Sequence, residues 1–169
     1  AEHVDDGEPA SAHEPAQPPL AVSRTGVDET GYGLFLRDFN PDRDAQLLLM
    51  LAFAPSLKPE FFDSLLQRVH PGAGEYPQFG GIRGKQHRGF LPTGDTALFL
   101  LAGDDLEARM RWQTLLCGEH PLVKAGVVYL EDPADGDPPM SGRLVIDNDH
   151  AELFINGKEI ANSFSELND

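Results

Sequence analysis

The chain has 169 residues, of which 28 are Asp or Glu and 13 are Lys or Arg, so its formal net charge at pH 7 is -15. This length predicts one domain, and the charge argues against general nucleic-acid binding because most of the surface repels phosphate. The single Cys117 excludes an internal disulfide, and no apolar run of about 18 residues is present to span a bilayer. The first residues also lack the features of a signal peptide, so we expect a soluble, cytoplasmic protein without a membrane partner.

Residues 1–30 hold seven acidic residues, four prolines and almost no large apolar side chain. Such a segment buries too little surface to offset the entropy lost on ordering. We therefore expect a flexible acidic leader over 1–30, a globular domain over 31–165 and the start of a linker over 166–169. The leader is either a solvated tail or an acidic lure for a basic partner.

Two helices are predicted in the first half of the domain. In NPDRDAQLLLMLAFA, Asn40 takes the N-cap position and Pro41 the first helical position, which predicts a helix near 42–53. Its apolar run has no polar side, which is typical of a central buried helix, although a buried strand would show the same run. KPEFFDSLLQRVHPG repeats the start and stop signals and predicts a second helix near 59–69.

A glycine-rich stretch follows, and between Tyr76 and Gly94 it contains no acidic residue. In so acidic a chain this predicts a cationic patch on a loop, unless the cations pair with the chain's own carboxylates. The glycines predict positive φ at one or more positions, and Phe79 and Phe90 are expected to anchor the loop ends in the core. The candidate partner-binding residues of this loop are Arg83, Lys85, His87 and Arg88.

Two further helices are predicted near 94–102 and 105–116. Thr93 is the expected N-cap of the first, and Gly103 ends it. Asp104 is the expected cap of the second, and Gly118 ends it. The buried stripe predicted for this second helix consists of Leu106, Met110, Leu116 and Cys117.

Strands are predicted near 126–131 and 142–147, and they form an antiparallel hairpin. Two interpretations of residues 147–160 compete. We favour a hairpin with an Asn156-Gly157 turn over a short helix capped by Asp147 or Asn148 and stopped by Gly157. The fold class is therefore α+β, a helical domain with a C-terminal antiparallel hairpin or sheet, which is an order of elements that winged-helix domains share. The expected core residues are Leu48, Leu51, Phe62, Leu65, Leu98, Leu101, Leu106, Val128 and Leu144.

No motif for catalysis, metal binding or cofactor binding emerges. Gly84-Lys85 is followed by Gln86 instead of Ser or Thr, which rules out a phosphate-binding P-loop, and the glycine spacing does not fit a dinucleotide site. The six histidines lack ligand spacing. Cys117 is expected in the core and not as a nucleophile, while His70 and His120, each before a proline, suit capping roles.

Three segments carry a family resemblance: EYPQFGGIRGKQHRGFLPTGDTALFLLAGDDLEAR, HPLVKAGVVYL and MSGRLVID. They resemble the N-terminal region of bacterial AAA+ ATPases encoded beside extracellular contractile injection systems, the phage-tail-like particles of the antifeeding-prophage and virulence-cassette type. The match runs from about 45 to 165 and is most specific from Gly80 to Asp105. It implies a hexameric parent whose motor domain binds ATP and magnesium. This chain carries no Walker motif and no arginine finger, so we expect no cofactor and no hydrolysis in it.

The leading functional hypothesis is a non-catalytic domain that recruits a protein partner or substrate to the AAA+ motor, or docks on that motor. One alternative is a winged-helix-like nucleic-acid-binding domain. The predicted helix at 105–116 argues against it, because its charges are balanced where a recognition helix concentrates Lys and Arg. The other alternative is a small enzyme whose site residues are distant in sequence.

Overall fold

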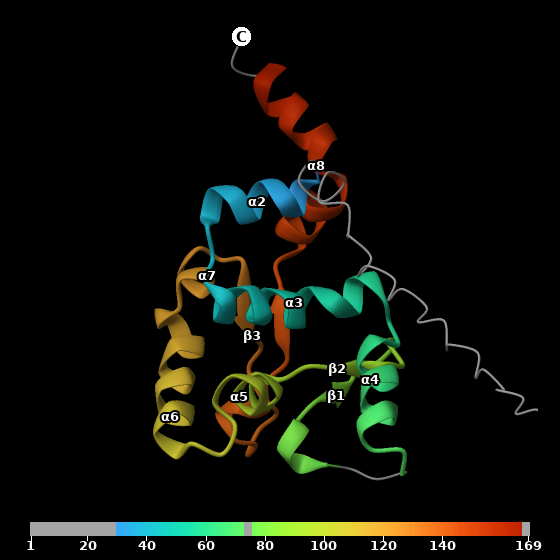
Figure 1. Ribbon diagram of the computed structural model, residues 1–169, viewed down its shortest axis with the longest axis vertical. Coiled ribbons are helices and arrows are strands. Elements are labelled where there is room, and N and C mark those ends of the chain that lie inside the picture. The colour runs from blue at the N-terminus through green and yellow to red at the C-terminus, as the bar shows by residue number, and fades with distance from the viewer. Residues whose placement is uncertain (1–29, 73–75, 167–169) are drawn as a thin grey trace, which may run out of the picture.

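The computed structural model describes residues 30–72 and 76–166, with the side chains of the last helix described as far as Gly157. The predicted leader up to residue 29 and the last three residues of the predicted linker lie outside this part. The α+β class is confirmed, and Figure 1 shows its arrangement. In chain order the elements are α2 (Gly31–Phe39), α3 (Arg43–Leu57), α4 (Phe61–Val69), η1 (Pro77–Phe79), β1 (Ile82–Arg83), β2 (Phe90–Leu91), α5 (Gly94–Ala102), α6 (Leu106–Thr114), η2 (Leu115–Glu119), α7 (Pro121–Lys124), β3 (Val128–Leu130), η3 (Pro139–Ser141), β4 (Leu144–Ile146) and α8 (Asn148–Glu166).

Helix α3 crosses the centre of the molecule, as its unbroken apolar run predicted, and its Leu48 and Leu49 are fully buried. Its cap differs from the prediction. The Asp42 carboxylate accepts a hydrogen bond from the Ala45 N–H at 2.8 Å and is the N-cap, whereas Asn40 ends the preceding helix in the left-handed conformation. The preceding helix, α2, was missed because its two glycines lower helix propensity.

The predicted hairpin at the C-terminus is wrong, because residues 148–166 form helix α8. Asp147 caps it as the helical alternative required, with its carboxylate accepting from the His150 N–H at 3.2 Å. The helix does not stop at Gly157. A Cβ at Gly157 would collide with the backbone of Gly31, so this glycine serves the close crossing of α2 and α8 instead of a turn.

Six of the nine predicted core residues are buried. Leu101 is half-buried, whereas Leu65 is 49% exposed and Leu106 is 74% exposed. The stripe predicted for α6 is correct at Leu116, which is buried, and wrong at Leu106, Met110 and Cys117, which are exposed. The face that α6 and the following turn bury holds Ala108, Trp112 and Leu116, spaced four residues apart. Leu106 and Met110, which the prediction chose, lie on the opposite face of the helix from Ala108 and Trp112.

The start of α6 differs from the prediction, because Asp105 and not Asp104 is the N-cap, and its carboxylate accepts from the Ala108 N–H at 3.1 Å. The helical path continues from α6 into the π-type turn η2 and is broken at Gly118, as predicted, where φ is 146°. Thr93 caps α5 and Gly103 ends it at φ 56°, also as predicted.

The C-terminal strand pair is confirmed. Strands β3 and β4 are antiparallel, with Val128 opposite Ile146 and Leu130 opposite Leu144. All three residues of β4 are buried, and β4 packs against α3. Strand β4 therefore lies in the core, while β3 buries Val128 and exposes Tyr129, so the pair packs on the domain and does not project from it as a wing. No helix in the described part of the chain is long and apolar enough to cross a bilayer.

His120 has the capping role expected of it. Its Nδ1 accepts from the Leu122 N–H at 3.1 Å, at the start of α7, and its ring stacks on Trp112 with the centroids 5.7 Å apart. Burial lowers the pKa of His120, and the nearby Asp42 and Asp44 oppose this effect without cancelling it. The imidazole therefore stays neutral, as the accepted hydrogen bond requires.

Gly157→Ala tests the crossing of α2 and α8. Helix propensity alone favours alanine by about 1 kcal/mol. Because the added Cβ collides with Gly31, we expect instead a net loss of about 1–2 kcal/mol in the free energy of unfolding, measured by urea denaturation. Gly72→Ala is the control, since its Cβ would meet only the Tyr76 hydroxyl at 3.8 Å. A stabilised Gly157→Ala variant would contradict the crossing.

His120 makes stability depend on pH. Because its pKa is lowered in the folded chain, the unfolded chain binds the proton more readily. The free energy of unfolding should therefore fall as pH drops below the ordinary histidine pKa of about 6.5. In His120→Asn, whose amide oxygen can still cap α7, we expect this part of the pH dependence between 7 and 5 to disappear. An unchanged slope would show that His120 is not the group responsible.

Candidate docking groove

The basic loop forms a short antiparallel hairpin, in which Ile82 pairs with Leu91 and Arg83 with Phe90. Gly80 and Gly81 precede it with φ of 60° and 90°, which confirms the predicted positive φ. Phe79 is buried and Phe90 packs partly buried against the core, so the two phenylalanines anchor the loop as expected.

Two buried threonine hydroxyls fix the base of this hairpin. Thr93 Oγ1 accepts from the Gly81 N–H at 3.0 Å, and Thr96 Oγ1 donates to the Phe79 carbonyl at 2.7 Å. Thr96 Oγ1 also accepts from the Thr93 N–H at 3.0 Å, which completes the capping box of α5. The same residues therefore start α5 and position the turn before β1.

Asp63 of α4 holds the hairpin farther along. Its carboxylate accepts from the Phe90 N–H at 2.8 Å and pairs with the Arg83 guanidinium at 2.7 Å. Arg83 also donates to the Arg88 carbonyl at 2.8 Å, so it closes the hairpin across both strands. Burial acts to raise the pKa of Asp63, but the Phe90 hydrogen bond, the Arg83 hydrogen bond and the Arg83 charge outweigh it, so the pKa lies below its ordinary value.

The four predicted partner-binding residues therefore divide into three kinds. Arg83 has an internal partner, as the alternative interpretation of the patch required. His87 is half-buried, and its Nε2 is buried without a hydrogen bond in the described part of the chain. Lys85 and Arg88 are exposed, and among the described residues no carboxylate forms an ion pair with either of them. They are the two cations of the hairpin free to contact a partner.

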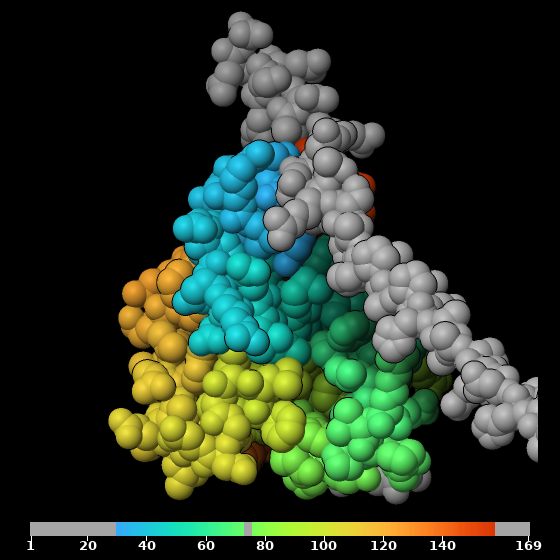
Figure 2. Space-filling view, in the orientation of Figure 1, coloured from blue at the N-terminus to red at the C-terminus, as the bar shows by residue number. Residues whose placement is uncertain are grey.

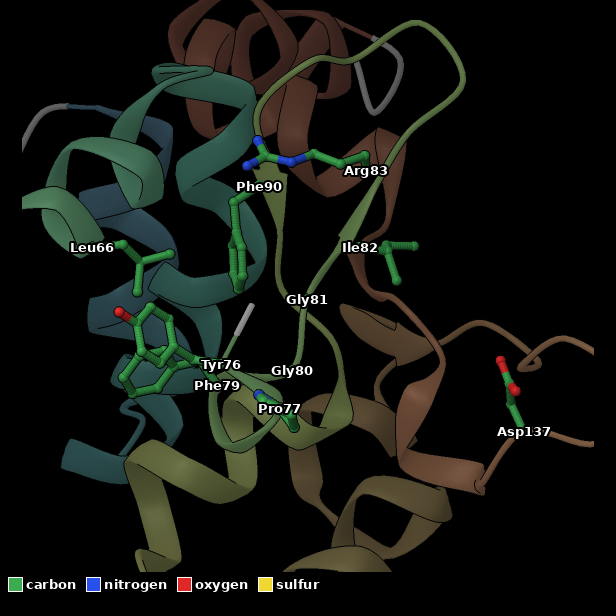
Figure 3. A pocket seen from close by; sticks show the side chains of 10 residues that line it. All are labelled: Leu66, Tyr76, Pro77, Phe79, Gly80, Gly81, Ile82, Arg83, Phe90 and Asp137. Atoms are coloured by element: carbon green, nitrogen blue, oxygen red, sulfur yellow. The ribbon is translucent and has the colours of Figure 1, made fainter. Parts of the chain in front are cut away.

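The hairpin borders a groove with a volume of about 870 Å³. In Figure 3, Leu66 of α4, Tyr76, Phe79 and Phe90 gather on one side of β1, while Ile82 points to the other side and Asp137 lies apart on the loop before η3. The Arg83 side chain reaches across toward β2 above Phe90. Most of the lining residues are apolar or aromatic, but polar atoms make up about half of the exposed lining, and the lining includes both the Arg83 guanidinium and the Asp137 carboxylate.

Aromatic side chains build one wall of the groove as a connected cluster. The ring of Tyr76 lies 5.5 Å from that of Phe79 and 4.7 Å from that of His70, which follows α4. Phe79 also makes an edge-to-face contact with Phe99 of α5 at 4.7 Å. Each of these rings therefore packs against at least one other ring of the cluster.

Helix α4 also exposes apolar side chains near this wall. Phe61, Leu65 and Val69 are spaced four residues apart and are 41%, 49% and 61% exposed. The neighbouring face of the helix is buried through Phe62, so the apolar arc of α4 is wider than the core requires. In Figure 2, α4 lies at the surface beside the lower edge of the molecule.

Sequence reasoning found the cations but missed Asp63, Leu66 and Tyr76. Asp63 is one of 28 acidic residues, and nothing in its neighbours distinguishes it. The one available signal was YPQF, in which two aromatic residues flank a turn-forming proline directly before the basic loop.

The charged side chains among the described residues that line the groove are Arg83 and Asp137. Within the described residues, no group of three or more His, Cys, Asp or Glu side chains is arranged to hold a metal ion. Comparison with protein-family models, with curated proteins and with solved structures gives no match to this chain. The geometry of the groove itself must therefore support any functional proposal.

Asp63→Asn tests the attachment of the hairpin to α4. Loss of the carboxylate charge weakens two hydrogen bonds, and we expect the free energy of unfolding at pH 7 to fall by about 1–2 kcal/mol. Because the pKa of Asp63 is lowered, its contribution is complete above an unfolded pKa of about 3.9 and is lost as pH falls through the folded pKa. The variant should therefore lose part of the acid dependence.

Glu60→Gln is the matched control for this experiment. Glu60 pairs with Lys58 at 3.8 Å on the surface, and both side chains are exposed. Surface pairs of this kind contribute between about 0 and 1 kcal/mol. Equal effects of Asp63→Asn and Glu60→Gln would contradict a structural role for the Asp63 carboxylate.

Proposed function

We propose that this chain is a non-catalytic protein-binding domain and that the groove beside β1 is its docking surface. The observation that carries the proposal is a groove with an aromatic wall, bordered by a hairpin whose charged residues are all basic. Apolar side chains of a partner segment fill the groove, and acidic residues beside them face Lys85 and Arg88. The partner is therefore a segment that combines apolar and acidic residues.

The charge distribution supports this choice of partner. The chain carries a net charge of -15, yet no acidic residue lies between Tyr76 and Gly94. An acidic segment is repelled by most of the surface and attracted to this hairpin, so charge selects both the partner and the place of contact. The internal ion pair of Arg83 with Asp63 fixes the backbone that presents the two free cations.

The resemblance to AAA+ ATPases of contractile injection systems supports a wider proposal. In that setting the domain recruits a partner or substrate to a hexameric motor or docks on the motor itself. ATP and magnesium then belong to the motor and not to this domain. The resemblance is most specific from Gly80 to Asp105, and this segment contains both the hairpin and the threonines that fix it.

Peptide display on the full chain tests the docking surface. A library of random peptides selected on immobilised protein should yield sequences that join aromatic or aliphatic residues to Asp or Glu. Their affinity should weaken at high salt because the screening length falls from about 10 Å at 0.1 M to 3 Å at 1 M. Lys85→Glu with Arg88→Glu should weaken binding about tenfold or more without lowering the melting temperature, because exposed charges add little to stability.

Arg37→Glu with Lys124→Glu is the control, since it makes the same charge change on exposed residues of α2 and α7 and breaks only a surface ion pair of Lys124 with Glu119 among the described contacts, which adds little to stability. Arg83 is left unchanged because its replacement would also break the contact with Asp63. Equal losses of peptide affinity in both variants would show that net charge alone causes the loss, and would overturn the assigned surface. Clear ATP turnover by the purified chain would overturn its non-catalytic character.

A further inference from the structure

We infer that the groove of the full chain takes the chain's own segment at residues 14–20, EPAQPPL, and that a partner must displace it. The inference rests on the proposed docking function of the groove and names its resident occupant. The segment precedes α2 and lies outside the described residues. Its proline spacing, its charge and the length of chain that joins it to the domain each match the groove.

The spacing of prolines provides the first match. Pro15 and Pro18 are three residues apart, and a polyproline II segment has three residues per turn with a rise of about 3.1 Å. In that conformation both rings would lie on one face, about 9 Å apart. Aromatic-lined grooves bind such segments because a preformed extended backbone loses little entropy on docking. Tyr76, Phe79 and Phe90 supply that lining.

Charge provides the second match. The residues before the prolines include Asp5, Asp6, Glu8 and Glu14, and the first 23 residues contain no Lys or Arg. The hairpin that borders the groove carries the exposed cations Lys85 and Arg88. A segment placed with its prolines on the aromatic wall brings its acidic neighbours toward these cations. The leader then acts as an internal copy of the acidic, apolar partner that the groove selects.

Reach provides the third match. Nine residues separate Leu20 from Thr30, where the described domain begins, and this length spans up to roughly 35 Å when extended. A domain of about 135 residues has a radius of gyration of about 14 Å and hence a diameter of about 37 Å. A tether that starts at Thr30, directly before α2, is therefore long enough for the prolines to reach the groove.

Tethering makes even weak docking effective. A short linker gives an effective concentration on the order of 1 mM, so a segment that binds with a Kd of about 0.1 mM when free occupies the groove about nine-tenths of the time. An external partner then binds about tenfold more weakly than to an empty groove. The leader thereby sets a threshold that only a tighter or multivalent partner exceeds.

Paramagnetic relaxation in the full chain tests the contact directly. Cys117 is exposed and is first changed to Ser, after which Ala12→Cys carries a nitroxide label. We expect selective broadening of the amide signals of Gly80, Gly81, Ile82 and Arg83. Either 0.5 M salt or Lys85→Glu with Arg88→Glu should remove the broadening, whereas Arg37→Glu with Lys124→Glu should leave it. Absence of selective broadening at the groove would overturn the inference.

Competition provides the second measurement and separates the two proposals. Full-length Pro15→Gly with Pro18→Gly should bind a display-selected peptide about tenfold more tightly than the natural sequence does. If the selected peptide binds the groove equally well in both chains, the internal occupant is wrong and the docking function stands. If the groove amides broaden but no external peptide binds at the groove, the contact stands and the proposed docking function fails.

Discussion

The buried hydroxyls of Thr93 and Thr96 connect the start of α5 to the turn before β1, and the structure around the groove depends on this connection. They complete the cap of α5 and also bind the backbone of Phe79 and Gly81 on the other side of the turn. Replacing either with an apolar residue would leave a buried backbone group unpaired, at a cost of about 1–3 kcal/mol for each group. The helix start and the base of the hairpin are thus one structural unit. Backbone bonds from Gly94 to Gly142 and from Leu144 to Pro92 connect that unit to β4 in the core.

The hairpin illustrates how one cluster of cations serves two purposes. Arg83 is used within the fold, because its ion pair with Asp63 and its bond to the Arg88 carbonyl close the hairpin against α4. Lys85 and Arg88 remain exposed at the tip. Internal contacts therefore order the loop, so under the proposed docking function a partner would not have to order it on binding. If that proposal holds, substitutions at Arg83 and at Lys85 and Arg88 should have separable effects on stability and binding.

Parts of the candidate site were predictable from sequence because their signals are local. The cationic loop, its positive-φ glycines and the Thr93 cap each depend on residues within a few positions of one another. The groove was not predictable in this way. It needs Leu66 of α4, Tyr76 and Phe90 to meet, and Asp63 reaches Phe90 across 27 positions of sequence. Nothing in the sequence near Asp63 distinguishes a carboxylate with such a partner from a solvated one.

The sequence by itself determined the α+β class, the central position of α3 and the antiparallel pairing of β3 with β4, because hydrophobic runs and turn residues act locally. Tertiary structure decided the face of α6 and the state of the C-terminal segment. On α6, contact with the core selected the face of Ala108 and Trp112 over the face of Leu106 and Met110, since only one face of a helix can pack there. At the C-terminus, Gly157 looked like a turn signal, yet close approach to Gly31 made it an interior helical residue. Glycine permits both outcomes, and only the neighbouring helix chooses between them.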